Sequence, residues 1–141
     1  MPRSYSIDTA RRIVVSRGWG VLTGPGLLEH SRSLAADARF DSSFMHLYDL
    51  RRVTDIQASS KDLATLAGVS PFGVDARRVS IVASDLAYGL SHMFEMLGER
   101  KGDTMHVTRD LDAALLWLGM VQHADAIVAA LEGAPDVSFE Q

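Results

Sequence analysis

The sequence predicts a single α/β domain in which an N-terminal β-hairpin leads into a mainly parallel five-stranded sheet, with helices mostly on one face. The first observation is a pair of short β-prone runs close together near the N-terminus. The second is that strand-like runs then alternate with segments of helical periodicity, which is typical of parallel strands joined by helical crossovers. The third is that the strands alternate apolar and polar residues instead of being apolar throughout. We therefore expect the second face of the sheet to be partly open.

The hairpin and the first helix follow from local signals. The hairpin strands are expected at Tyr5–Asp8 and Ile13–Ser16, and Gly18-Trp19-Gly20 is expected to end the second strand. Thr23 is the expected N-cap of a helix that runs to about Ala38.

The remaining elements are expected from the same kinds of signal. Strands are expected at Phe44–Asp49, Val79–Ala83 and Met105–Thr108. Helices are expected after Ser59 or Ser60, after Ser84-Asp85 and after Asp110, where a capping residue precedes an apolar stripe. Gly119 either breaks or bends the last helix, because an interior glycine costs only ~1 kcal/mol relative to alanine. We expect one domain over residues 1–132 and a flexible acidic tail over residues 133–141.

The composition excludes several classes of protein. A chain of 141 residues with 47% hydrophobic content is long enough for one core. Its net charge of −4 and pI near 5.6 argue against a nucleic-acid binder. The absence of cysteine excludes a disulfide framework and a thiol nucleophile. No run approaches the ~18 apolar residues of a membrane span, and the N-terminus has no apolar signal region, so we expect a cytoplasmic protein without integral membrane association.

Three segments carry a resemblance to a known family. They are RRVSIVASDLAYGLSHMFE (Arg77–Glu95), RDLDAALLWL (Arg109–Leu118) and MHLYDLRRV (Met45–Val53). In these segments the chain resembles the SpoIIAA-like family, which has the STAS-type fold. The resemblance implies a β-hairpin, a mainly parallel sheet and about four helices.

The resemblance also bears on phosphorylation. Members of the family that antagonise anti-sigma factors are switched by phosphorylation of a serine just after the third strand, in an Asp-Ser-Ser-Gly-like motif. Here Asp49 matches the aspartate, but Leu50-Arg51-Arg52 stands where the serines would be. The chain is therefore similar to an uncharacterised bacterial branch that lacks the phosphoacceptor serine. Whether Thr54 or another hydroxyl is phosphorylated is left open.

One candidate site is an anion-binding crevice at the edge of the sheet where the parallel strands end. We expect Arg51, Arg52, Ser84 and Arg109 at this edge, beside helix N-termini that favour negative charge. The alternative is that Arg51 and Arg52 form a solvated turn and pair with Asp49 or Asp55.

A second candidate is a protein interface on the helix after Ser84-Asp85. Tyr88, His92 and Met96 are spaced four residues apart, off the stripe expected to face the core. Methionine and aromatic residues are enriched at interfaces, but such a stripe is also found on ordinary surfaces.

The sequence contains no established catalytic or metal-binding pattern. The five histidines, among them the strand residues His46 and His106, show no metal-ligand spacing, and no nucleophile elbow or phosphate-binding glycine motif is present. We therefore expect no metal and no cofactor. His46 and His106 are expected to share the open face as partly solvated residues.

The favoured function is a non-enzymatic regulatory or binding module. It would act through protein contacts, including self-association as a homodimer, and would take a small anionic ligand at the edge of the sheet. The alternative is a protein that binds a lipid or an apolar small molecule between helices and sheet. An enzyme that uses the edge crevice is less favoured, because no catalytic signature is present.

Overall fold

The computed structural model describes residues 3–99 and 104–133, and the side chains of residues 94–99 and 104 are not among those described. It contains one sheet, in the order β1 (Arg3–Asp8), β2 (Ile13–Thr23), β3 (Met45–Gln57), β4 (Arg77–Ile81) and β5 (Thr104–Thr108). β1 pairs with β2 in antiparallel orientation, and every later pair is parallel. The predicted hairpin and five-stranded sheet are confirmed, with β4 in the interior of the sheet.

The described residues contain five helices, of which all but the last begin at a predicted cap. They are α1 (Gly24–Ala36), α2 (Ser60–Gly68), α3 (Asp85–Glu99), α4 (Leu111–Leu118) and α5 (Ala124–Gly133), with a 3-10 turn at Val121–His123. Thr23 Oγ1 accepts a hydrogen bond from Gly26 N at 3.1 Å, and Ser59 forms a reciprocal capping box with Asp62. Gly119 adopts a left-handed conformation with φ of 72° and ends α4, so the C-terminal helix is broken there.

Two strands, β2 and β3, extend seven or eight residues beyond their predicted ends, whereas β1 and β5 begin only one or two residues earlier than predicted. β2 continues through Gly18-Trp19-Gly20, with irregular register on either side of Trp19 and with Gly20 at a φ of 68°. β3 continues past Asp49 to Gln57 because its distal half pairs with this extension of β2. The glycines were expected to end β2. They instead allow a long, irregular strand pair that extends beyond β4.

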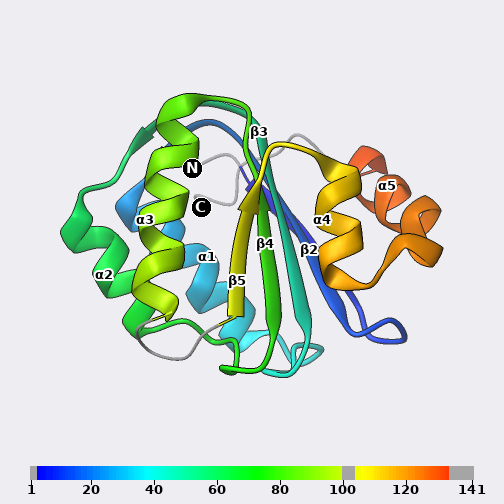
Figure 1. Cartoon of the computed structure of the whole chain (residues 1–141). Helices are drawn as coiled ribbons and strands as arrows, with labels where there is room; N and C mark the ends of the chain where they lie inside the picture. Colours follow the sequence, from blue (N-terminus) through cyan, green and yellow to red (C-terminus); the bar gives the residue numbers. More distant parts are fainter. Residues whose placement is uncertain (1–2, 100–103, 134–141) are drawn as a thin grey trace.

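The helices form a layer on each face of the sheet (Figure 1). Helices α1, α2 and α3 lie on one side, and α4 and α5 lie on the other. The second face is therefore not left partly open. It carries the largest apolar cluster, in which Ile13, Leu47 and Ile81 of the strands pack against Leu115 of α4 and Ile127 of α5.

The described part of the chain ends with helix α5. Gly133 ends α5, and the rest of the predicted acidic tail, residues 134–141, lies outside the described residues. Among residues 3–99 and 104–133, no helix combines the length and the apolar character that a membrane span requires.

Candidate functional site

A cavity of about 110 Å³ lies between the sheet and helices α1, α2 and α3. Its walls are rich in leucine, including Leu22, Leu34, Leu50, Leu63, Leu66 and Leu90. A smaller group of polar side chains also lines it, including His30, Ser31, His46, Tyr48, Arg78 and Ser80. Apolar walls with a few polar groups are the usual composition of a small-molecule site.

Several of the buried polar side chains come from neighbouring positions of three parallel strands. Ser16, Tyr48 and Ser80 are register partners on β2, β3 and β4. His46 and Arg78 are partners two residues earlier on β3 and β4. Register partners, and residues two apart on one strand, point to the same face of a sheet. The polar half of the strand pattern, which predicted an open face, is therefore a buried face beneath α1, α2 and α3.

At the centre of this face, one serine joins two histidines. Ser16 Oγ lies 2.7 Å from His46 Nε2 and 3.0 Å from His30 Nε2, and all three residues are buried. A hydroxyl can donate to one imidazole and accept from the other, so a single serine satisfies both rings. The His46 ring also stacks on Phe72 at 4.7 Å between ring centroids.

Both imidazoles are held in the neutral form. Burial lowers the pKa of His30 to about 3, and the positive charge of Arg3 adds to this effect. Burial also lowers the pKa of His46 well below its ordinary value, with further contributions from His30 and Arg78. Removing an imidazolium from water is costly, so both rings stay uncharged at neutral pH.

The Tyr48 hydroxyl is a buried hydrogen-bond donor of a residue that lines the cavity. The Tyr48 ring stacks on His30 at 4.8 Å between centroids, but within the described part of the chain its hydroxyl has no hydrogen-bond partner. Burial raises the pKa of Tyr48, so the phenol keeps its proton. A buried polar group without a partner costs about 1–3 kcal/mol, which a ligand that accepts a hydrogen bond would recover.

The cluster is not arranged for acyl transfer or metal binding. Ser16 is fully buried with its oxygen held between two imidazoles, and neither ring is hydrogen-bonded to a carboxylate in the described residues. A serine nucleophile needs an exposed oxygen, a base and a group that orients the base. No group of three or more potential metal ligands occurs among residues 3–99 and 104–133.

Comparison with solved structures supports the resemblance in fold. A crystal structure of an uncharacterised protein from the DUF3478 family, from Shewanella loihica PV-4, is described as having a SpoIIAA-like fold, and it matches with a TM-score of 0.56. The chain has a SpoIIAA-like fold. The match covers 84% of this chain and 95% of the other at 15% sequence identity, so it shows the fold alone. No protein-family model and no curated protein matches the chain.

The arginines expected at the sheet edge of this SpoIIAA-like fold do lie at one edge. Asp49, Ile81 and Thr108 form the last register row shared by β3, β4 and β5, and the arginines follow one to three residues later. Arg51 and Arg52 are nevertheless exposed residues of strand β3, so the expectation that this strand ends at Asp49 and that a turn holds the two arginines is wrong.

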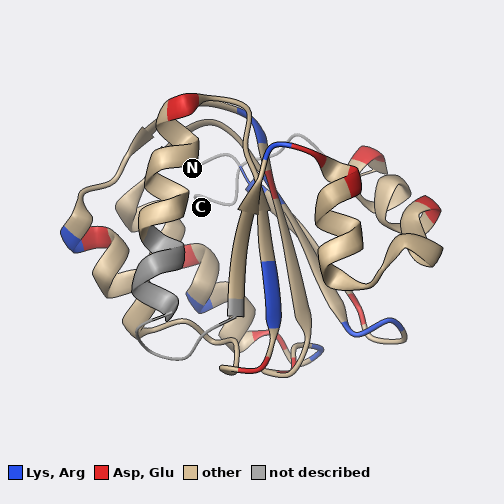
Figure 2. Ribbon diagram, in the orientation of Figure 1, with Lys and Arg blue, Asp and Glu red and all other residues tan. Residues whose placement is uncertain are grey.

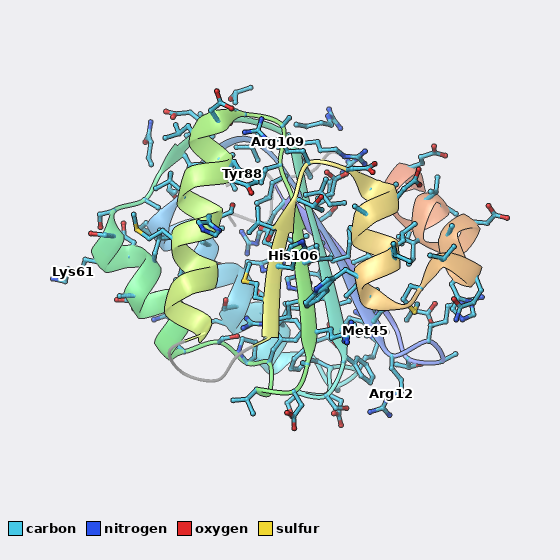
Figure 3. All side chains as sticks on the ribbon, in the orientation of Figure 1. Arg12, Met45, Lys61, Tyr88, His106 and Arg109 are labelled. Carbon is cyan, nitrogen blue, oxygen red and sulfur yellow. The ribbon has the colours of Figure 1, made fainter. Side chains whose placement is uncertain are left out.

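Two of these arginines already contact carboxylates. Arg51 Nε and Nη2 each lie 2.9 Å from an oxygen of Asp49, and Arg109 Nη2 lies 2.7 Å from Asp85 Oδ1. Figure 2 shows basic and acidic positions close together at this edge of the sheet, and Figure 3 labels Arg109 there. Ser84 Oγ accepts a hydrogen bond from Ala87 N and caps α3. An anion at this edge would therefore have to compete with Asp49 and Asp85.

Two of the expected interface residues, Tyr88 and His92, are exposed on α3. The rings of Tyr88 and His92 stack at 6.1 Å between centroids, and the Arg109 guanidinium lies 4.9 Å from the centre of the Tyr88 ring (Figure 3). The Met96 side chain lies outside the described residues. Leu86 and Met93 are also exposed, by 53% and 40%, so this side of α3 is partly apolar.

The residues of the cavity were not predicted as a site. His46 and His106 do not share a face, because their register positions differ by one row and His106 stacks on Trp117 of α4. A usable signal was present in α1. His30 falls on the same helical stripe as Leu27 and Leu34, where a buried histidine needs a polar partner from the sheet.

Proposed function

We propose that this protein binds a small, mainly apolar molecule in the cavity between the sheet and α1, α2 and α3, without catalysing a reaction on it. One observation carries the proposal. Leucine walls and the buried Tyr48 hydroxyl, which has no hydrogen-bond partner among the described residues, occur in the same internal space. Such a space binds an apolar molecule, and a single hydrogen-bond acceptor on that molecule would increase its affinity.

The volume of the cavity limits the size of the ligand. An engineered cavity of roughly 150 Å³ in another protein binds benzene. The cavity here is about 110 Å³, so it suits a molecule no larger than benzene, which has about six non-hydrogen atoms. A lipid with long acyl chains would require the helices to move apart, so a small molecule is favoured over a lipid.

Half-buried residues give the ligand a path to this space. Leu27 and Ser31 of α1, Ser70 after α2, and Leu90 and Ser91 of α3 line the cavity and are partly exposed. One end of the cavity therefore lies close to the surface, between the helices.

A regulatory module that acts through protein contacts is the second candidate. It is favoured by the exposed apolar side of α3, where Leu86, Tyr88 and Met93 are 53%, 37% and 40% exposed. The two functions are compatible, because α3 carries cavity residues on one side and this surface on another.

Titration with 2-pentanone, followed by amide NMR, tests the proposal. This probe has about six non-hydrogen atoms and an acceptor oxygen. It should shift the amides of cavity residues in the wild type. Ser31→Leu should abolish the shifts, because Ser31 lines the cavity and leucine would fill it. Ser33→Leu is the matched control, since Ser33 is half-buried on the same helix and does not line the cavity.

The titration distinguishes binding in the cavity from binding elsewhere or from no binding. Shifts in the wild type and in Ser33→Leu, with none in Ser31→Leu, support binding in the cavity. The proposal is wrong if the wild type does not respond, or if Ser31→Leu binds as well as Ser33→Leu does. Native mass spectrometry of freshly purified protein would add the mass of any molecule that co-purifies.

A further inference from the structure

We propose that the ligand is a small primary amide, which donates a hydrogen bond to one of two buried histidines, His30 and His46, and accepts one from the other. This inference rests on the proposed function, because it names the ligand class of the same cavity. It is carried by the hydrogen bonds of Ser16, which fix the protons of both rings and leave one nitrogen of each ring without a partner among the described residues.

Ser16 holds both rings through the same nitrogen. Its Oγ lies 2.7 Å from His46 Nε2 and 3.0 Å from His30 Nε2. Both histidines line the cavity, whereas Ser16 is not among the residues that line it. The serine therefore contacts the rings from outside the cavity, and each ring keeps its second nitrogen, Nδ1, for another partner.

The single hydroxyl proton of Ser16 decides which nitrogen of each ring is protonated. Burial lowers the pKa of His30 and that of His46, so each ring is neutral and carries one proton at neutral pH. If both rings donated to Ser16, its buried hydroxyl proton would have no acceptor. If both rings accepted, one bare nitrogen would face the serine oxygen with no proton between them. One ring therefore donates from Nε2 and the other accepts there.

The two Nδ1 atoms are then a matched donor and acceptor. The ring that donates from Nε2 has a bare Nδ1, which accepts a hydrogen bond, and the other ring carries its proton on Nδ1. His30 and His46 are only 3% and 8% exposed, so bulk water has little access to either ring. Buried polar atoms without a partner are destabilising, and a ligand that offers both a donor and an acceptor would satisfy this pair.

A primary amide complements the pair better than other small polar groups do. Its N–H donates to the bare Nδ1, and its carbonyl oxygen accepts from the protonated one. A carboxylate cannot donate, and an ammonium cannot accept. The two ring centroids are 5.9 Å apart, so a group with its donor and acceptor on separate atoms reaches both rings more readily than a single hydroxyl does. The hydrocarbon chain of the amide would lie among the leucines of the same cavity.

Two isosteric probes test the inference by amide NMR on the wild-type protein. Butyramide and 2-pentanone have the same number of non-hydrogen atoms and differ only in that an NH₂ group replaces a CH₃ group. Butyramide should bind more tightly, by about three-fold, because its N–H finds an acceptor. In a cavity without such an acceptor, the more polar amide should bind more weakly than the ketone.

The ring nitrogens give an independent measurement. Long-range proton–nitrogen correlation spectra distinguish protonated from bare ring nitrogens, and they should show opposite tautomers for His30 and His46. Whichever ring has the bare Nδ1, its replacement (His30→Phe or His46→Phe) should weaken butyramide about ten-fold and leave 2-pentanone unchanged. His106→Phe is the matched control and should change neither affinity, because His106 stacks on Trp117 of α4 on the opposite face of the sheet.

Failure of the inference is distinguishable from failure of the proposed function. If butyramide binds no more tightly than 2-pentanone, or if the two histidines have the same tautomer, the amide assignment is wrong while cavity binding stands. If neither probe binds the wild type, both proposals are wrong. The probe comparison and the tautomer spectra use the wild-type protein, so they decide the matter even if a histidine variant does not fold.

Discussion

Ser16 Oγ and His46 Nε2 lie 2.7 Å apart in the interior, although the two residues are 30 positions apart in the sequence. His30 joins the same oxygen from α1 at 3.0 Å. The contact therefore ties β2, β3 and α1 together at one point on the cavity side of the sheet. This buried hydrogen-bonded cluster of Ser16, His30 and His46 is stable only while both imidazoles are neutral.

Acid should destabilise the protein from about pH 6.5 downward. The folded-state pKa of His30 is about 3, below its ordinary value of 6.5, and that of His46 is lowered in the same sense. The unfolded chain therefore binds more protons below about pH 6.5, and stability falls as the pH falls. Each histidine contributes up to about 1.4 kcal/mol per pH unit.

Urea denaturation at several pH values between about 7.5 and 4.5 measures the slope of the free energy of unfolding against pH. His30→Phe should reduce it by up to one proton, whereas His92→Gln, at an exposed position on α3, should leave it unchanged. An identical slope in wild type and His30→Phe would show that His30 is not buried in the neutral form.

Tyr48→Phe should not destabilise the unliganded protein. The substitution removes a buried hydroxyl that has no partner among the described residues. The free energy of unfolding should be equal to that of the wild type or higher by about 1 kcal/mol. Tyr5→Phe is the matched control, because the Tyr5 hydroxyl donates to Asp37 Oδ2 at 3.0 Å and its loss should cost about 1 kcal/mol. A larger loss for Tyr48→Phe than for Tyr5→Phe would mean that Tyr48 has a partner.

Phosphate should bind the sheet edge only weakly. It would have to displace Asp49 from Arg51 and Asp85 from Arg109, so we expect a dissociation constant of about 1 mM or weaker that rises steeply with salt. Phosphate titrated in low salt should shift the amides of residues 51–54, 84–86 and 109 together. If they respond no more than Arg77 at the opposite edge, the anion site is absent and the arginines serve only their ion pairs.

Self-association, if it occurs, should depend on the exposed side of α3. Tyr88 is 37% exposed, so Tyr88→Asp should leave the fold intact and convert a dimer into a monomer. Sedimentation velocity over a range of concentrations measures this, and circular dichroism reports the fold. Thr54→Asp, at an exposed position of β3, is the control. A wild-type protein that stays monomeric at high concentration would rule out the homodimer.

The elements that the sequence predicted well are those with strong local signals. Thr23 and Ser59 cap their helices as expected, and β4 is an interior strand, although it spans Arg77–Ile81 where Val79–Ala83 was expected. The ends of β2 and β3 were predicted less well. Gly18-Trp19-Gly20 is a local breaker signal, but pairing with the distal half of β3 outweighs it.

The cavity could not be predicted, because its parts come from distant segments. His30 and His46 lie 14 and 30 residues from Ser16, and no spacing rule connects them. The alternation of polar and apolar residues in the strands did identify an unusual face of the sheet. It did not show whether α1, α2 and α3 or solvent would cover that face, since this depends on the path of the crossovers.

The central claim is that an empty, mainly apolar cavity lies beneath α1, α2 and α3. A crystal structure determined under xenon pressure tests it most directly, because xenon binds in empty apolar cavities and cannot enter an interior that side chains fill. We predict xenon density between the sheet and α1, α2 and α3, in contact with Leu34 and Leu66 and close to Tyr48. Ser31→Leu should lose this density and Ser33→Leu should keep it. A wild-type interior filled by its own side chains, with no xenon at this position, would contradict the account.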